Sequence, residues 1–209
     1  MLINKSQLNA IDIASTDRTR PVIESLRLRQ LDDGRTEATA TDGYTAIKVT
    51  ADNGNPVDFV TNTDGTALPS THQAVIHRNI VTKISKILPK PSAAIKALPL
   101  QANVLIGDGV ASASDTETID QIKYSTEKIS YDSYPHSIDD IMAKPTEAEK
   151  LTTTRVNPRL LIDLLKQFKD QPAVDLAIEI NQVTPKLYID SEDHETKETK
   201  AAVLMPLKR

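Results

Sequence analysis

An amphipathic helix followed by short strands recurs three times along this chain of 209 residues, and that order constrains the fold more than any other feature. Apolar residues return at helical spacing over residues 5–14 and again over residues 77–88. A third helix is expected where Asn157 can cap the backbone and Pro158 can open the first turn. The repeat length is about 70 residues, which indicates a fold built from three similar units.

Short runs of alternating apolar and polar residues follow each helix. Turn-forming clusters of Gly, Asn, Asp and Pro separate these runs, as in antiparallel hairpins. Strands are expected from Leu26 to residue 29 and over residues 36–41, 46–50, 73–76, 104–106, 110–113, 119–124, 151–156, 174–180, 186–190 and 201–204. The pattern therefore predicts an α+β fold with antiparallel sheets.

The polar, charged segment 144–150 has the composition of a linker. It divides the chain into a two-unit domain over residues 1–143 and a single unit, or half domain, over residues 151–209. Two bodies of unequal size are therefore expected.

Several classes of protein are excluded by what the sequence lacks. It has no Cys, so disulfides and thiolate metal sites are excluded and a cytoplasmic location is expected. No apolar run approaches the roughly 20 residues of a membrane span. No phosphate-binding loop or nucleophile motif is present, and the histidines are scattered without metal-ligand spacing, so surface or turn positions are expected for them: His72, His77, His136 and His194. We expect no enzyme activity, no cofactor and no metal.

Positive charge gathers on two of the three helices. The formal net charge is -4, yet residues 77–90 carry +4 and residues 157–169 carry +2, which leaves -10 for the rest of the chain. The basic residues are Arg78, Lys83, Lys86, Lys90, Arg159, Lys166 and Lys169. They can be ordinary solvated helix faces, or a surface that attracts phosphates without reading sequence. With two Phe and no Trp, base stacking is not expected to contribute.

Four segments resemble the bacterial sliding clamp, the beta subunit of DNA polymerase III. Residues 18–26 are similar to its Arg-Pro-Val strand, and residues 38–46 to its Ala-Thr-Asp-Gly-aromatic turn. Residues 131–135 look like the segment that ends a clamp domain, and residues 203–208 like the clamp's C-terminal tail. The resemblance spans nearly the whole chain. It pairs residues 1–143 with a complete clamp domain, the middle one, and residues 150–209 with the second half of the last domain.

The resemblance implies the DNA-clamp fold, in which helices lie on one face of a continuous curved sheet and line a hole around duplex DNA. It also implies a groove on the outer face that binds short hydrophobic motifs of polymerases and other DNA-processing proteins. Carried over by motif, the groove residues are Ile23, Thr41, Gly43, Tyr44, Thr45, Ala46, Pro135, Ile141, Val203, Met205, Pro206, Leu207 and Lys208. Thr45 stands where the family usually has a basic residue. As an alternative, Met205 and Leu207 simply close the core.

The leading hypothesis is a shortened, non-enzymatic accessory protein of DNA replication or repair that binds polymerase-type peptides and approaches duplex DNA through its basic helices. The alternative is an interaction protein that competes for or sequesters clamp-binding partners without encircling DNA. An enzyme with an unrecognised site is the third reading. A homo-oligomer is expected. Four chains of three units would supply the twelve units of a ring, but each half domain would need a partner half from a neighbouring chain, so closure of a ring is a hypothesis.

Overall fold

The computed structural model describes ten stretches of the chain: residues 1–54, 68–88, 103–114, 119–125, 129–135, 137–143, 156–171, 173–179, 186–192 and 198–205. The predicted linker 144–150 and all but the last residue of the strand predicted over residues 151–156 lie outside these stretches. The division into domains therefore stays a prediction.

The described elements follow the predicted order of helix then strands. The bounds in the first unit are β1 (Leu2–Ile3), α1 (Lys5–Asn9), β2 (Ser25–Gln30), β3 (Thr36–Thr41) and β4 (Thr45–Ala51). The second unit comprises β5 (Gln73–His77), α2 (Arg78–Ile87), β6 (Val104–Ile106), β7 (Val110–Ser114) and β8 (Ile119–Lys123). The third comprises α4 (Pro158–Lys166), β9 (Asp175–Glu179), β10 (Lys186–Glu192) and β11 (Thr199–Leu204). Between the second and third units lies α3 (Ser137–Ile141).

Helices α1, α2 and α4 each begin where a side chain caps a backbone amide of the first turn. Asn4 forms a capping box with Gln7 at the start of α1. Asn157 accepts from the amide of Arg159, with Pro158 in the first turn of α4, as the sequence predicts. The second helix was expected from His77, but it starts at Arg78 because the His77 side chain accepts from the Asn79 amide and serves as the cap.

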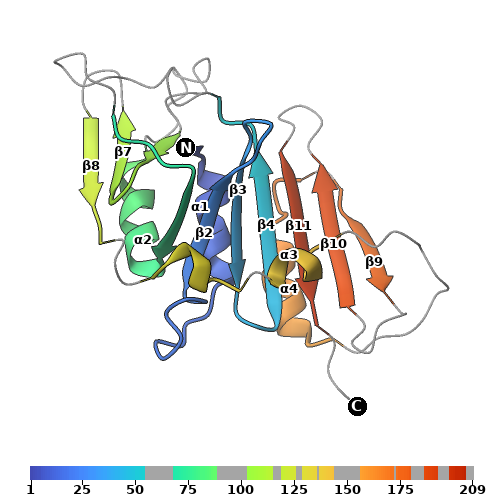
Figure 1. Cartoon of the computed structure of the whole chain (residues 1–209). Helices are drawn as coiled ribbons and strands as arrows, with labels where there is room; N and C mark the ends of the chain where they lie inside the picture. Colours follow the sequence, from blue (N-terminus) through green and yellow to red (C-terminus); the bar gives the residue numbers. More distant parts are fainter. Residues whose placement is uncertain are drawn as a thin grey trace.

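Two antiparallel sheets carry the fold. The larger has the order β5-β2-β3-β4-β11-β10-β9, and the smaller has the order β1-β6-β7-β8. The first two units exchange their leading strands, since β1 pairs with β6 of the second unit and β5 pairs with β2 of the first. Helices α1, α2 and α4 lie behind the sheets in Figure 1, whereas α3 lies in front. We call these two sides the helix face and the outer face.

The main core fills the space between the helices and the sheets. It joins Leu8 of α1, Ile84 of α2 and Leu164 of α4 to strand residues such as Ala40 and Ile47. A smaller cluster lies on the outer face under α3. No described helix is long and apolar enough to cross a membrane.

Candidate functional site: the outer-face junction and the basic helix face

The junction between β4 and β11 joins the first unit to the third. Ala46 pairs with Val203 and Thr45 with Leu204, and the Met205 amide donates to the Tyr44 carbonyl at 3.0 Å. The pairing brings the segment predicted to resemble the clamp turn beside the segment predicted to resemble the clamp tail. Residues about 160 positions apart in sequence therefore form one surface.

The turn before β4 is held by a single carboxylate. Asp42 Oδ1 accepts from the amides of Tyr44 and Thr45, at 2.8 and 2.7 Å, and from the Thr45 hydroxyl at 3.0 Å. Gly43 has a φ of 92°, which side chains with a Cβ rarely adopt. Tyr44 is consequently held at the tip of a rigid turn with 66% of its surface exposed.

A second contact brings Ile23 to the same end of the sheet. The Ser15 amide donates to the carbonyls of both Ile23 and Thr41, at 2.9 and 3.2 Å. The Thr41 hydroxyl donates to the Thr45 carbonyl at 2.7 Å. Ile23, Thr41 and the Asp42 turn are thus fixed relative to one another.

Helix α3 crosses the outer face over this junction. Its segment supplies Tyr134, Ile138 and Met142, which are buried against Ala46 of β4, Val203 of β11 and Tyr188 of β10. Met205 packs against the same cluster and is half buried. Lys186 of β10 donates to the Ile141 carbonyl at 2.7 Å. We call this group the outer-face cluster.

An ionic network anchors α3 on the side of the first unit. Arg27 of β2 is 1% exposed and forms two hydrogen bonds with Asp139 of α3, at 2.6 and 3.0 Å. Its guanidinium carbon lies 5.3 Å from the ring centre of Tyr134. Burial acts to raise the pKa of Asp139, but the hydrogen bond and charge of Arg27, with the charges of Arg29 and Lys48, outweigh it and hold that pKa below its usual value.

Glu37 completes this network from β3. It lies 2.8 Å from Arg29 and 3.6 Å from both Arg27 and Lys48. Three cations, Arg27, Arg29 and Lys48, therefore share the two carboxylates of Glu37 and Asp139 on the outer face.

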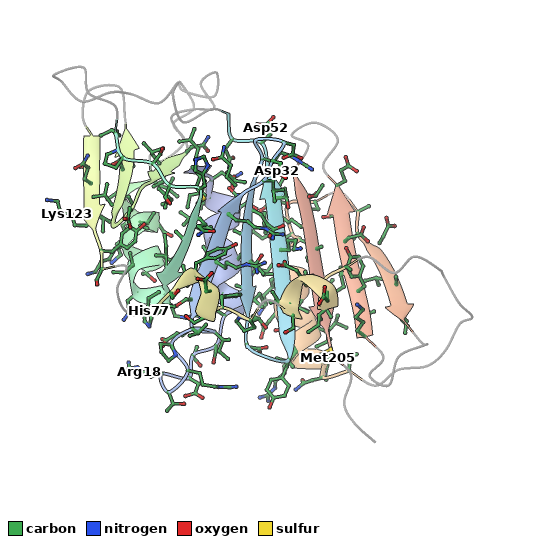
Figure 2. All side chains as sticks on the ribbon, in the orientation of Figure 1. Arg18, Asp32, Asp52, His77, Lys123 and Met205 are labelled. Atoms are coloured by element: carbon green, nitrogen blue, oxygen red, sulfur yellow. The ribbon has the colours of Figure 1, made fainter. Side chains whose placement is uncertain are left out.

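Most of the predicted groove residues are described, and they gather at this junction. Ile23, Thr41, Gly43, Tyr44, Thr45, Ala46, Val203 and Met205 lie around the junction and its turn, with Pro135 and Ile141 in the α3 segment. Ile141 is 38% exposed. Figure 2 places Arg18 and Met205 at the same end of the sheet. Pro206, Leu207 and Lys208 lie outside the described residues. Whether the surface binds a peptide stays a prediction.

Sequence reasoning missed α3 and the network beneath it. Ile138 and Met142 are four residues apart, which is the spacing of one helix face, and they follow a Tyr-Pro pair. That spacing was the available signal. Nothing in the sequence linked Arg27 to Asp139.

The predicted DNA-facing residues lie on the helix face, on α2 and α4 and just after α4. Lys83, Lys86, Arg159 and Lys169 are exposed. The Arg78 guanidinium is instead half buried and donates to the carbonyls of Ala14 and Ser15. Lys90 lies outside the described residues.

Acidic residues reduce the positive charge of the helix face near α4. Lys166 is paired with Asp163 at 2.7 Å, and the pair is exposed. A hollow of about 260 Å³ between α1 and α4 is lined by Lys166 and Lys169 together with Asp12 and Asp170. Arg159, Lys83 and Lys86 are therefore the cations best placed to meet phosphates, and Lys169 is exposed but shares its hollow with two carboxylates.

The described residues hold no group of three or more His, Asp or Glu side chains able to bind a metal ion. Of the predicted surface histidines, His72 is exposed and His77 is half buried, where it caps α2 and contacts Glu24 at 3.2 Å. His136 and His194 lie outside the described residues.

No protein-family model matches the sequence, and no curated protein matches it either. Solved structures do match the fold of this chain. The fold is similar to the DNA polymerase III subunit beta of Pseudomonas aeruginosa, with a TM-score of 0.55 and 12% identity over all of this chain and 67% of that one. It is also similar to a putative DNA polymerase III beta subunit from Eubacterium rectale, with a TM-score of 0.52 and 11% identity over all of this chain and 64% of that one.

The predicted DNA-clamp fold is thereby confirmed, in a shortened form. The chain spans about two thirds of the length of those beta subunits. At 11–12% sequence identity the similarity is one of fold alone.

Proposed function

We propose that this protein is a clamp-like accessory protein of DNA replication or repair, which binds polymerase-type peptides on its outer face and duplex DNA on its helix face. The observation that carries the proposal is the outer-face junction. There the Met205 amide is bonded to the carbonyl of Tyr44 in the Asp42 turn, and Met205 packs against the outer-face cluster under α3, the helix that carries the exposed Ile141. The half-buried Met205 and the exposed Tyr44 and Ile141 suit an extended peptide with Leu or Phe anchors, and the flexible Met205 can adapt to either anchor.

The helix face supplies the second half of the proposal. Lysines and arginines on helices attract phosphates without contacting base edges, so binding to duplex DNA is expected to be independent of sequence and sensitive to salt. We expect DNA to occupy only the helix face, which leaves the outer face, where Glu37 and Asp139 are paired with cations, accessible to protein partners.

Fluorescence anisotropy with a labelled peptide carrying Leu and Phe anchors tests the outer face. Met205→Lys places a charge against the outer-face cluster and should weaken binding at least tenfold. The matched control is Lys123→Ala, on the β8 edge far from Met205 in Figure 2, which should leave the affinity unchanged. Equal binding by the wild-type chain and Met205→Lys would refute the outer-face assignment.

Retention on circular and linear plasmid DNA separates this function from that of a sequestering protein. An encircling protein stays on nicked circular DNA at high salt and slides off linear DNA. A protein that only competes for clamp partners shows the peptide binding above and no such difference between the two plasmids.

A further inference from the structure

A cleft of about 250 Å³ lies between the two sheets. One wall is β5, the end strand of the larger sheet on the side of β7 and β8 in Figure 1. The smaller sheet contributes Asp108, in the turn between β6 and β7, and Tyr124, directly after β8, while Tyr131 comes from the segment before α3. We call this space the inter-sheet cleft. None of its described lining residues belongs to the predicted groove or to the hollow between α1 and α4.

Apolar and aromatic side chains line much of the inter-sheet cleft. Ala74 and Tyr124 pack against the main core, and Val75 packs against the outer-face cluster. Ile129 lines the same cleft and is half buried. Such a lining suits the aliphatic stem of a ligand, because binding then removes carbon surface from water.

Asp108 gives the cleft a negative charge. Among the described residues that line the cleft it is the only one charged at neutral pH, and none of them is Lys, Arg or His. Asp108 is exposed and takes part in none of the ion pairs found in the described part of the chain. Burial, with the charge of Asp108, raises the pKa of Tyr124, so that phenol stays neutral. A cation in the cleft would therefore neutralise Asp108, whereas an anion would meet it without compensation.

The turn that carries Asp108 is held in place by hydrogen bonds. The Gly107 amide donates to the Val110 carbonyl at 2.8 Å, and the Tyr124 hydroxyl donates to the Gly107 carbonyl at 2.8 Å. The Tyr124 amide donates to the Gly109 carbonyl, also at 2.8 Å. The backbone of Asp108 and the ring of Tyr124 are therefore ordered before a ligand arrives, which lowers the entropy cost of binding.

Backbone carbonyls of β5 offer further acceptors. The Gln30 amide of β2 donates to the His72 carbonyl at 2.7 Å, just before β5 begins. Because bonded positions alternate along an antiparallel pair, the carbonyls of Gln73 and Val75 point away from β2 and toward the cleft that both residues line. The Gln73 carbonyl accepts from the Thr71 hydroxyl at 3.0 Å. The Val75 carbonyl can accept from a ligand that carries several N–H donors.

Arg29 of β2 interacts electrostatically with Tyr131, but its charge is balanced elsewhere. Its guanidinium lies 2.8 Å from Glu37 and 3.5 Å from Asp139. Arg29 is thus held in the ionic network and not at Asp108, whose charge is left to a ligand.

We propose that the inter-sheet cleft binds an alkylammonium group, the end of a lysine side chain or of a polyamine. The ammonium pairs with the Asp108 carboxylate and has donors left for a backbone carbonyl such as that of Val75. The ring of Tyr124 attracts the cation, and the aliphatic stem lies along Tyr124 and Ile129. The site is separate from both surfaces of the proposed function and does not depend on them.

An NMR titration with two matched probes tests the need for the charge. Nα-acetyl-lysine methylamide carries the ammonium, and Nα-acetyl-norleucine methylamide carries an aliphatic stem of the same length without it. The lysine probe should bind with a Kd of about 1 mM or lower, and the norleucine probe about tenfold more weakly. Equal affinities for the two probes, or no saturation by the lysine probe up to about 10 mM, overturn the proposal.

The variant Asp108→Asn removes the charge from the cleft, so the lysine probe should bind about fivefold more weakly. Asp120→Asn is the matched control, because it removes an exposed carboxylate near the start of β8 and should leave the affinity unchanged. Equal losses in the two variants would mean that net charge alone attracts the probe, which contradicts a site at Asp108.

The positions of the shifted signals give a second readout. In the wild-type chain the amide signals of Gly107, Gly109 and Tyr124 should move with the lysine probe, whereas that of Tyr44 at the outer-face junction should stay. Shifts confined to the junction would refute the site. Met205→Lys should leave the shifts at Tyr124 in place even though it weakens peptide binding, so failure of this site is distinguishable from failure of the proposed function.

Spermidine distinguishes the two sources of the ligand. Spermidine and the lysine probe are each titrated into the wild-type chain and into Asp108→Asn. A larger fold-loss of affinity for spermidine identifies a free polyamine, and a larger loss for the lysine probe identifies a lysine side chain of a protein partner. If neither ligand loses affinity in Asp108→Asn, the inter-sheet cleft is not the binding site.

Discussion

The guanidinium of Arg27 on β2 lies 2.6 Å from the carboxylate of Asp139 on α3, although 112 residues separate them in sequence. This ion pair fixes α3 to the first unit, while the Lys186 contact to the Ile141 carbonyl fixes it to the third. Helix α3 therefore acts as a brace across the β4–β11 junction. The proposed peptide surface depends on the position of α3, because Ile138 and Met142 pack against Val203 on the outer face.

Replacing Asp139 by Asn should destabilise the chain by about 2 kcal/mol. The change leaves the buried Arg27 with Glu37 at 3.6 Å as its nearest carboxylate. Urea unfolding followed by circular dichroism measures the loss. Asp140→Asn is the matched control, because Asp140 is an exposed neighbour on the same helix and should cost less than about 0.5 kcal/mol.

The same pair predicts how stability changes with pH. The folded-state pKa of Asp139 is held below its ordinary value of 3.8, so its contribution is complete above that value and is lost as the pH falls through the folded-state pKa. The difference in unfolding free energy between wild type and Asp139→Asn should therefore be full at pH 7 and shrink below about pH 4. A difference that persists unchanged at pH 2 would mean that the Asn variant is destabilised by something other than the lost charge.

The local elements could be predicted from the sequence because each is encoded by nearby residues. Strand β3 matches its expected bounds, and Asn157 with Pro158 marks the start of α4. Helix α3 was missed because its five residues make little more than one turn and no helical segment continues it, whereas the equally short α1 continues into a 3-10 helix at Ala10–Ile13 that extends its apolar spacing. Strand β1 has two residues, which are too few to alternate. The pairing of β4 with β11 and of Arg27 with Asp139 joins distant segments. No local pattern encodes such contacts, and only the family resemblance pointed to the junction.

Asp42 should be needed for peptide binding as well as for stability. Asp42→Ala removes the acceptor of three hydrogen bonds, so the turn that carries Tyr44 should loosen and the affinity for the labelled peptide should fall about tenfold. Asp33→Ala is the control. Asp33 holds a comparable turn by accepting from the Arg35 amide at 3.0 Å, but that turn joins β2 to β3, at the end of the sheet opposite Met205. If both variants lose affinity equally, the effect comes from general loss of stability and not from the turn.

Lys83 and Lys86 should contribute to duplex DNA binding through phosphates alone. The slope of log K against log salt concentration is negative, and each phosphate contact contributes about 0.9 to its magnitude. Replacing both Lys83 and Lys86 by Ala should therefore reduce the magnitude of the slope by about 2 for any duplex sequence. Lys123→Ala on the β8 edge is the control, since it removes an exposed cation away from the helices and should leave the slope unchanged. Anisotropy titrations of two unrelated duplexes over a range of salt concentrations give the slopes. An unchanged slope in the double variant would remove α2 from the DNA-binding surface and leave Arg159 and Lys169, in and just after α4, as its remaining candidates.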